Sequence, residues 1–392
     1  MSNQSKKNSD IDFFKKEEKV MLGVYKQLSL SVISAKGCEL ITNDNRKILD
    51  LYGGHAVMPL GYGEVNFLDS VNTQMTKLLF QSNLLPLEIR ARAAENLLAI
   101  APDGLAKVFF VNSGSEANEN ALKIACLATG RKKILAVTHG FHGRTAASAA
   151  VTWGAKNNWY GFPTMPFEVE FIPRDDLSAV NNMINSKIAA VIIEPIQGVA
   201  GAYDLSFDFL RSIRQKCHEA SVVLIVDEVQ SGMGRSGNYF AIQNYDIEPD
   251  ILTTAKSLGG GIPCAALITT DYLSNYLKVG DLGSTFGGGP LACSAINAVI
   301  ESLSKNKLLQ NVKMMEKEIR ERCLVGPVKK IQGKGLLLGL VCNRPATEIQ
   351  AELLHRDILT GTSADNNVLR LLPPLILQSH HIDKLSDALA SI

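Results

Sequence analysis

Long apolar runs are missing from this sequence. No stretch approaches the roughly 20 apolar residues that a membrane-spanning helix needs, and the first residues, MSNQSKKNSDIDFFKKEEKV, lack the apolar core of a secretion signal. An excess of one charge is also missing, because 40 Lys and Arg side chains stand against 39 Asp and Glu side chains. We therefore expect neither a membrane nor a nucleic acid as a partner.

Cysteine and histidine motifs are missing as well. The seven cysteines form no CxxC pair, and the seven histidines form no HExxH motif. An odd number of scattered cysteines is typical of reduced thiols, so the sequence predicts a cytoplasmic protein. The segment HGFH at 139–142 offers two imidazoles but no third ligand close by, so we expect no metal site.

Nucleotide-binding fingerprints are absent too, since the chain has no GxGxxG and no GxxxxGK[ST]. Short apolar runs instead alternate with segments of helical period from about residue 70 to 270. Strands are predicted at 107–111, 133–137, 169–172, 189–195, 222–229, 250–255 and 264–270, and helices at 115–130, 176–185 and 206–221. This alternation predicts an α/β fold with a mostly parallel sheet covered by helices on both faces.

The two ends of the chain differ from this pattern. Residues 11–30 include a predicted amphipathic helix, and 33–54 read as short strands around the turn TNDNRK. A long helix is predicted over 289–323, followed by strands near 335–341 and 368–377 and a short terminal helix. We expect a large domain at 51–284, a small α+β domain at 285–392, and an N-terminal segment, 1–50, that joins the small domain.

The segment NSGSEANENALK (112–123) places Ser-Gly-Ser between a predicted strand and a helix. Ser113 and Glu116 match a capping box. Free backbone N–H groups at a helix start, together with hydroxyls, bind phosphate well. An ordinary capped turn is the simpler interpretation of this motif alone.

The segment LIVDEVQSGMGRSG (224–237) delivers Asp227 to the carboxyl end of a predicted strand. In open α/β sheets, ligands bind at that edge. A buried carboxylate needs a cationic partner there, because burying it unpaired is costly. The alternative is an aspartate that only caps the next turn.

Lys256 is the only charge between Asp250 and Asp271, and it is followed by Gly259, Gly260 and Gly261. Desolvation lowers the pKa of a lysine, and its free amine is then a nucleophile for carbonyls. The alternative is a lysine at a strand end whose ammonium reaches out to solvent. A phosphate cradle, a strand-end acid and an isolated lysine are the parts that pyridoxal 5′-phosphate needs. We expect the three glycines to let the backbone pass close to this cofactor.

Six segments carry a family resemblance: NSGSEANE, FHGRT, EPIQG, DEVQSGMGR, AKSLGGGIP and STFGGGPLACSA. From about residue 50 to the C-terminus the sequence resembles the class III (ω-amino) aminotransferases, and most of all their acetylornithine aminotransferase branch. The resemblance implies the PLP-dependent transferase fold of type I, with the cofactor in the large domain. It also implies ping-pong transfer from N-acetylornithine or a related amino acid to 2-oxoglutarate, a role in arginine biosynthesis, and a homodimer with active sites at its interface.

The same resemblance implies roles for individual residues. Those on the cofactor are Lys256 as the Schiff-base lysine, Asp227 on the pyridinium nitrogen, Gln230 on the phenolic oxygen, Gly114 and Ser115 on the phosphate, Phe141 and Val229 on the two ring faces, and Thr285 on the phosphate of the other subunit. On the substrate side are Arg144, Ser284 and Arg370, because guanidinium pairs bidentately with carboxylates. Arg370 is also a lone charge in the apolar run VLRLLPPLIL, for which a structural ion pair is the alternative.

Four positions depart from the family pattern. Val199 stands where many relatives have a glutamate that covers the arginine matching Arg370, GYGEV (61–65) replaces GHxHP, Met58 replaces an asparagine, and Leu84-Leu85 replaces an aromatic pair. We hypothesise that Val199 and Leu84-Leu85 make the pocket more apolar and change the donor. Alternatives are ornithine, 4-aminobutyrate or a diamine as donor, a racemase or decarboxylase on the same scaffold, and an inactive dimer.

Overall fold

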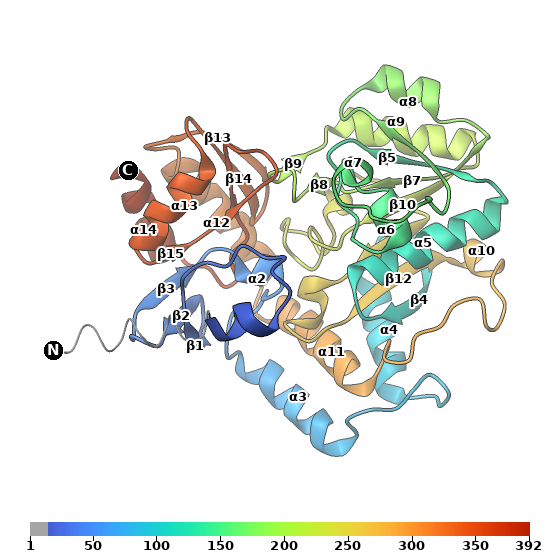
Figure 1. The fold of residues 1–392 in the computed structure, drawn as a ribbon. Helices are drawn as coiled ribbons and strands as arrows, with labels where there is room; N and C mark the ends of the chain where they lie inside the picture. The colour runs from blue at the N-terminus through green and yellow to red at the C-terminus, as the bar shows by residue number, and fades with distance from the viewer. Residues whose placement is uncertain (1–14) are drawn as a thin grey trace.

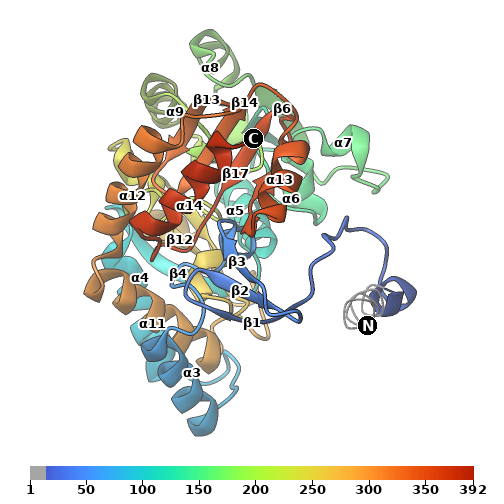
Figure 2. The same cartoon turned by 90° about the vertical axis from the view of Figure 1, so that its left-hand side faces the viewer.

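The computed structural model describes residues 15–392. A large α/β unit is built on a seven-stranded sheet, and a smaller unit gathers the C-terminal elements with the first strands of the chain (Figures 1 and 2). None of the helices found in residues 15–392 has the length and apolar character needed to cross a bilayer.

The large sheet carries the strands that the sequence predicts. In spatial order they are β4 (Leu105–Val111), β12 (Ala265–Thr270), β11 (Ile251–Thr254), β10 (Val223–Asp227), β7 (Ile188–Ile193), β5 (Lys133–Val137) and β6 (Glu168–Ile172). All neighbours are parallel except β12, which runs antiparallel to both β4 and β11. Every residue of β7, β10 and β11 is buried, which explains their continuous apolar sequence. The expected mostly parallel sheet is confirmed.

Helices cover both faces of this sheet. The main ones are α5 (Gly114–Thr129), α8 (Leu177–Met183) and α9 (Phe207–Glu219). Successive residues of β5 point to opposite faces, so Leu135 packs in the same core cluster as Phe209 of α9, whereas Ile134 packs with Leu122 of α5. The expected cover on two faces is therefore confirmed.

Helix α5 begins and ends where its sequence predicts. The Ser113 hydroxyl accepts from the Glu116 N–H at 3.2 Å, and the Glu116 carboxylate accepts from the Ser113 N–H at 3.0 Å, so the capping box is formed. At the other end Gly130 adopts φ 65°, the left-handed conformation that suits glycine.

The smaller unit holds two short sheets. Its elements are β13 (Val328–Lys334), β14 (Leu337–Cys342), β17 (Val368–Leu371) and β16 (Gly361–Thr362) in one antiparallel sheet, β1 (Val32–Lys36), β2 (Glu39–Thr42), β3 (Lys47–Asp50) and β15 (Ile358–Leu359) in the other, and the helices α12 (Leu308–Arg322), α13 (Ala346–His355) and α14 (Ser379–Ala390). Pairing of β15 with β3 attaches the N-terminal strands to the C-terminal part of the chain. The domain limits at residues 50 and 284 stay a prediction.

The helix predicted over 289–323 is wrong as a single element. It divides into α11 (Pro290–Lys305) and α12, with Lys307 in a left-handed conformation at φ 51° between them. The two helices pack on different partners, because α11 contacts α3 (Val65–Lys77) and α4 (Glu88–Ile100) whereas α12 contacts α14. One straight helix could not pack on both sets of partners.

Two other predictions are corrected in part. Of the helix expected in 11–30, residues 11–14 lie outside the described part of the chain, 15–20 are helical, and 21–30 form neither helix nor strand. The strand expected over 368–377 ends at Leu371, before Pro373 and Pro374. The remaining short elements are α6 (Ala146–Ala150), α7 (Ala155–Asn158), α10 (Asp271–Ser274), β8 (Ile196–Gln197), β9 (Tyr203–Asp204), the 3-10 turns η1 (Ala241–Asn244) and η2 (Lys256–Gly259), and α2 (Gly53–Ala56).

Candidate active site

A cavity of about 280 Å³ lies at the carboxyl ends of β10 and β11. Seven of the eight cofactor residues expected from the sequence line it: Gly114, Ser115, Phe141, Asp227, Val229, Gln230 and Lys256. Larger hollows beside β6 contain none of them. The fold thus brings these seven residues together at the sheet edge where ligands of α/β proteins bind.

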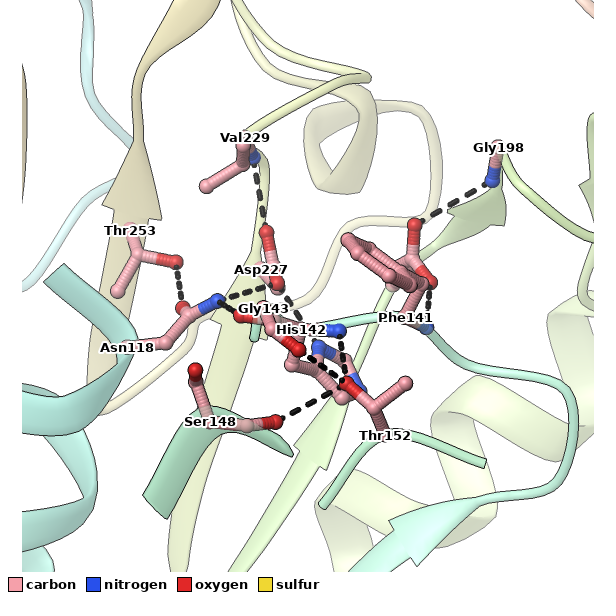
Figure 3. Close-up of polar contacts among 11 residues, drawn as sticks. Asn118, Phe141, His142, Gly143, Ser148, Thr152, Gly198, Asp227, Val229 and Thr253 are labelled. Atoms are coloured by element: carbon pink, nitrogen blue, oxygen red, sulfur yellow. Dashed lines mark hydrogen bonds and ion pairs between the residues drawn. The ribbon is translucent and has the colours of Figure 1, made fainter. Parts of the chain in front are cut away.

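Asp227 is the last residue of β10, and it is only 3% exposed. Its Oδ2 accepts from Nδ1 of His142 at 2.8 Å and from Nδ2 of Asn118 at 2.7 Å (Figure 3). Its Oδ1 accepts from the N–H of Val229 at 2.9 Å. Only this last bond is the local turn contact of a capping aspartate. The other two come from distant segments and compensate the burial of the carboxylate.

Asn118 connects the elements around Asp227. It lies in α5, and its Nδ2 also donates to the carbonyl of His142 at 2.7 Å. Its Oδ1 accepts from the hydroxyl of Thr253, in β11, at 2.7 Å (Figure 3). The loop at His142 is held further by its N–H, which donates to the hydroxyl of Thr152 at 2.9 Å. These bonds fix the position of Asp227 relative to α5.

The sequence-based site lacks Asn118 and His142. Asn118 is a weak helix former on the buried face of α5, beside Ala117 and Ala121, and this misplaced polar residue was the available signal. His142 lies in HGFH, where the sequence raised a metal pair. The ring of the other histidine of that segment, His139, lies 5.6 Å from the ring of Trp153 and is tilted by 45° to it. No cluster of three potential metal ligands occurs in residues 15–392.

Lys256 follows β11 after one residue, Ala255, and is the first residue of the 3-10 turn η2. Its φ of 48° is left-handed, a conformation that costs a non-glycine residue about 1 kcal/mol and that clusters at functional sites. Burial lowers the pKa of its ammonium to about 8, although the nearby carboxylates of Asp227 and Glu194 act in the opposite direction. At neutral pH about a tenth of the Lys256 side chains is therefore free amine, far more than for a lysine with its ordinary pKa.

The glycines after Lys256 do not border the cavity, so that expectation is wrong. A Cβ on Gly260 would lie 2.8 Å from the ring of Phe67 in α3 and 3.0 Å from Val299 in α11, and one on Gly261 would lie 3.2 Å from the sulfur of Met58. On this segment only Ala255 and Lys256 line the cavity. The glycines instead let the chain pass close to Phe67, Val299 and Met58.

Glycines do shape the cavity at the start of α5. A Cβ on Gly114 would lie 2.8 Å from the side chain of Val229. A Cβ on Gly143, whose φ is 141°, would overlap the hydroxyls of Ser115 and Ser148. The loop after His142 therefore lies directly against the helix start, where unpaired N–H groups favour an anion.

Glu194 lines the cavity and holds two of its backbone segments. Its carboxylate accepts from the N–H of Phe141 at 2.8 Å and from the N–H of Gly198 at 3.3 Å. The pKa of this carboxyl is raised to about 7, chiefly by burial; His142 acts to lower it and Asp227 acts in the same direction as burial. Near it, the amide oxygen of Gln230 is buried without a hydrogen-bond partner among the described residues.

The two arginines differ in burial. Arg370 is 7% exposed and donates to the carbonyls of Thr362 and Gly198, at 2.7 and 3.2 Å, and to the hydroxyl of Tyr52 at 2.7 Å. Arg144 is exposed, with its guanidinium 5.0 Å from the ring centre of Phe141. The structural ion pair considered for Arg370 is not formed with any residue of 15–392, because its partners are all neutral.

Ser284 and Thr285 lie outside the cavity of their own chain. The hydroxyl of Ser284 accepts from Nδ2 of Asn112 at 3.2 Å and from the N–H of Gly287 at 3.0 Å, and Thr285 is exposed. Of the departures from the family pattern, Val199 lines the cavity, whereas Leu84 is 86% exposed and does not.

Comparisons with known proteins agree with this geometry. Residues 23–392 match the family model "Aminotransferase class-III". The acetylornithine aminotransferase of Methanocaldococcus jannaschii is 36% identical over 387 residues, 96% of each chain, and that of Methanopyrus kandleri is 37% identical over 380 residues, 95% of this chain and 97% of the other.

Solved structures show the same likeness. An acetylornithine aminotransferase from Elizabethkingia anophelis superposes with a TM-score of 0.87 at 26% identity, over 98% of this chain and 99% of the other. An ornithine aminotransferase from Toxoplasma gondii is described with partial occupancy of PLP at its active site. It superposes with a TM-score of 0.90 at 25% identity, over 97% of this chain and 93% of the other. With a family model matched over nearly its whole length, this chain belongs to the class III aminotransferases.

Proposed function

We propose that the cavity holds pyridoxal 5′-phosphate and that the protein transfers an amino group from N-acetylornithine, or a related ω-amino donor, to 2-oxoglutarate by a ping-pong mechanism. One observation carries this proposal: Lys256, Asp227 and the start of α5 line the same cavity of about 280 Å³. When bound, this cofactor acts as an electron sink for the carbon that bears the amino group. A role in arginine biosynthesis is part of the proposal.

The residues present fit such a cofactor. The N-terminus of α5, with Gly114 and Ser115, offers N–H groups and a hydroxyl to a phosphate. Asp227 would hold the ring nitrogen, and Phe141 and Val229 would pack on the two ring faces. The unpartnered amide of Gln230 supports a polar cofactor atom beside it, because buried polar groups almost always have a partner.

Lys256 is proposed as the covalent anchor and as the proton carrier. Its lowered pKa leaves Nζ unprotonated often enough to attack an aldehyde. Once a substrate amine has replaced it, Nζ is a free base that can accept a proton from the amine-bearing carbon and return one. Asp227, held in position by three N–H donors, lines the same cavity as this amine.

Arg370 and Arg144 are proposed to bind substrate carboxylates, with Ser284 assisting. Arg370 is suited to this because it is buried and has only neutral partners. Both halves of the proposed reaction present a carboxylate, so the same guanidinium would serve donor and acceptor in turn.

We also propose a cytoplasmic homodimer in which Thr285 reaches the cavity of the partner. Exposed apolar side chains occur on the segment of Thr285 and on the loop joined to it: Phe80 and Phe286, whose rings lie 5.2 Å apart, and Leu84 and Leu85. Nδ2 of Asn83 donates to the carbonyls of Ser284 and Gly287, which joins the two loops. We call Phe80, Leu84, Leu85 and Phe286 the Thr285 patch. Several exposed apolar side chains on joined loops are typical of an interface.

The test uses the holoenzyme and its visible absorbance. N-acetylornithine alone is expected to bleach the absorbance, and 2-oxoglutarate added afterwards to restore it. Lys256→Ala is expected to lose all cofactor that borohydride can fix to the chain, whereas Lys329→Ala, at an exposed position, is expected to keep it. Covalent cofactor retained by Lys256→Ala would contradict the site, and no response to N-acetylornithine would contradict the donor.

A further inference from the structure

We propose that Tyr52 is a specificity-determining residue, and that its hydroxyl forms one carboxylate receptor together with the guanidinium of Arg370. The inference rests on the proposed function of Arg370 as a carboxylate-binding residue. It adds a neutral hydrogen-bond donor that was not among the residues singled out in the sequence.

The donors of Arg370 define where a carboxylate fits. A guanidinium carries one hydrogen on Nε and two on each terminal nitrogen. Nε–H donates to the carbonyl of Thr362, one Nη1 hydrogen to the carbonyl of Gly198, and one Nη2 hydrogen to the hydroxyl of Tyr52. One hydrogen is left on each terminal nitrogen. Such a pair matches the two oxygens of a carboxylate.

The hydroxyl of Tyr52 stands next to this pair with its own hydrogen available. It accepts from Nη2 at 2.7 Å, and no acceptor for its hydrogen occurs among the residues that the structure describes. Burial raises the pKa of the phenol, so the hydroxyl keeps its hydrogen at neutral pH, even though Arg370 opposes this shift. A carboxylate bound to Arg370 would therefore meet a third donor.

The contact between Tyr52 and Arg370 is built into the fold. Gly361 of β16 lies directly opposite Arg370 of β17. Any Cβ at Gly361 would overlap the ring of Tyr52, so a glycine is required for the ring to cross this strand. The guanidinium carbon lies 5.5 Å from the ring centre, close enough for a cation–π contact.

A strained turn holds Tyr52 in place. Residues 53–56 have φ values of 54°, 58°, 66° and 64°, and this left-handed conformation costs His55 and Ala56 about 1–2 kcal/mol each. The carboxylate of Asp50 accepts from the N–H groups of Tyr52 and Gly53, at 2.8 and 2.9 Å. At the other end of the turn, the carbonyl of Ala56 accepts from the hydroxyl of Ser257 at 2.7 Å.

This turn joins the receptor to the reactive lysine, because Ser257 is the residue after Lys256. Strain of this kind persists only where the surrounding structure enforces it, and it clusters at binding sites. The turn thus fixes the distance between the carboxylate receptor and the amine that reacts. The Tyr52 hydroxyl is expected to select for substrates with a carboxylate at that distance.

The experiment measures binding of glutarate to the holoenzyme by calorimetry. Glutarate has the two carboxylates of 2-oxoglutarate but no carbonyl that can react. Tyr52→Phe removes the hydroxyl and keeps the ring, and it is expected to weaken glutarate binding about tenfold. Tyr62→Phe is the matched control, because the Tyr62 hydroxyl donates to the same Asp50 at 2.8 Å but does not contact Arg370. It is expected to bind glutarate like the wild type.

Kinetics provide a second readout. Tyr52→Phe is expected to raise the KM for 2-oxoglutarate about tenfold with a smaller change in kcat. The bleaching of the holoenzyme by propylamine, which has no carboxylate, is expected to stay unchanged. A purely structural effect of the substitution would alter both reactions.

The outcomes separate this inference from the function on which it rests. If Arg370→Gln and Arg370→Lys bind glutarate like the wild type, the carboxylate role of Arg370 fails and the inference fails with it. If these variants bind weakly but Tyr52→Phe binds as well as or better than the wild type, only the role of Tyr52 is overturned. Equal losses in Tyr52→Phe and Tyr62→Phe would also overturn it.

Discussion

At the residue scale, Asp227 and Lys256 have opposite environments in the cavity. Asp227 receives three N–H donors, two of them from distant segments. The side chain of Lys256 donates no hydrogen bond to any described residue, and burial disfavours its charge. The carboxylate of Asp227 is held in place by hydrogen bonds, whereas burial leaves Lys256 ready to react as an amine.

The first prediction concerns the pH dependence of cofactor loading. The pKa of Lys256 is lowered to about 8, so its ammonium form predominates below pH 8 and its nucleophilic amine above. The rate at which the apoenzyme forms its covalent cofactor is expected to rise about tenfold per pH unit below pH 8 and then level off. Stopped-flow absorbance between pH 6.5 and 9.5 measures this rate.

Non-covalent cofactor binding to Lys256→Ala serves as the control. Its affinity is expected to show no step near pH 8, because the titrating amine is gone. A wild-type loading rate that keeps rising to pH 10, near the ordinary pKa of lysine, would show that the cavity does not desolvate Lys256.

At the element scale, the division between α11 and α12 directs two helices to different partners. Lys307 forms the break with φ 51°, which costs a residue that has a Cβ. The break lets α11 pack on α3 and α4 while α12 packs on α14. Helix α11 also contacts η2, which carries Lys256, so its placement affects the site.

Replacement of Lys307 by glycine is therefore expected to stabilise the protein by about 0.5–1 kcal/mol, because glycine adopts this conformation without strain. Lys305→Gly is the matched control. Lys305 is the last residue of α11, is exposed and has no left-handed strain to relieve, so glycine there is expected to bring no gain in stability. Thermal unfolding of the wild type, Lys307→Gly and Lys305→Gly measures these changes in stability. A lower unfolding midpoint for Lys307→Gly than for the wild type would refute the prediction.

At the scale of the whole molecule, the Thr285 patch is the surface on which the proposed dimer depends. Leu84 is 86% and Phe286 is 65% exposed, and they lie on the two loops that Asn83 joins. Thr285, on one of these loops, does not line the cavity of its own chain. The departure at Leu84-Leu85 would then act on the partner's active site. Its effect on donor choice stays a prediction.

Leu84→Asp is expected to shift the protein from dimer to monomer and to reduce activity in proportion, because a charge would be buried at the interface. Leu324→Asp alters an exposed leucine after α12, away from the patch. It is expected to leave the oligomeric state and the activity unchanged. Light scattering and activity at several protein concentrations measure the two properties. A fully dimeric Leu84→Asp protein would exclude this patch from the interface.

The sequence by itself determined the parallel sheet and the central residues of the site. Strands such as β7 and β10 are buried on both faces, so their apolar runs are visible without a structure. Asp227 and Lys256 stand out for the converse reason, as charges at the ends of such runs. The family segments then supplied the roles of Gly114, Ser115 and Gln230, which local pattern alone would have left as turn residues.

Only the tertiary structure decided which side chains complete the site. Asn118 and His142 meet Asp227 across 109 and 85 residues of chain, and Tyr52 meets Arg370 across 318. No helical or strand period links positions so far apart. The break between α11 and α12 is similar, because both halves have helical sequences and only their different packing partners require them to separate. Such contacts depend on how the elements pack against one another, which no local pattern encodes.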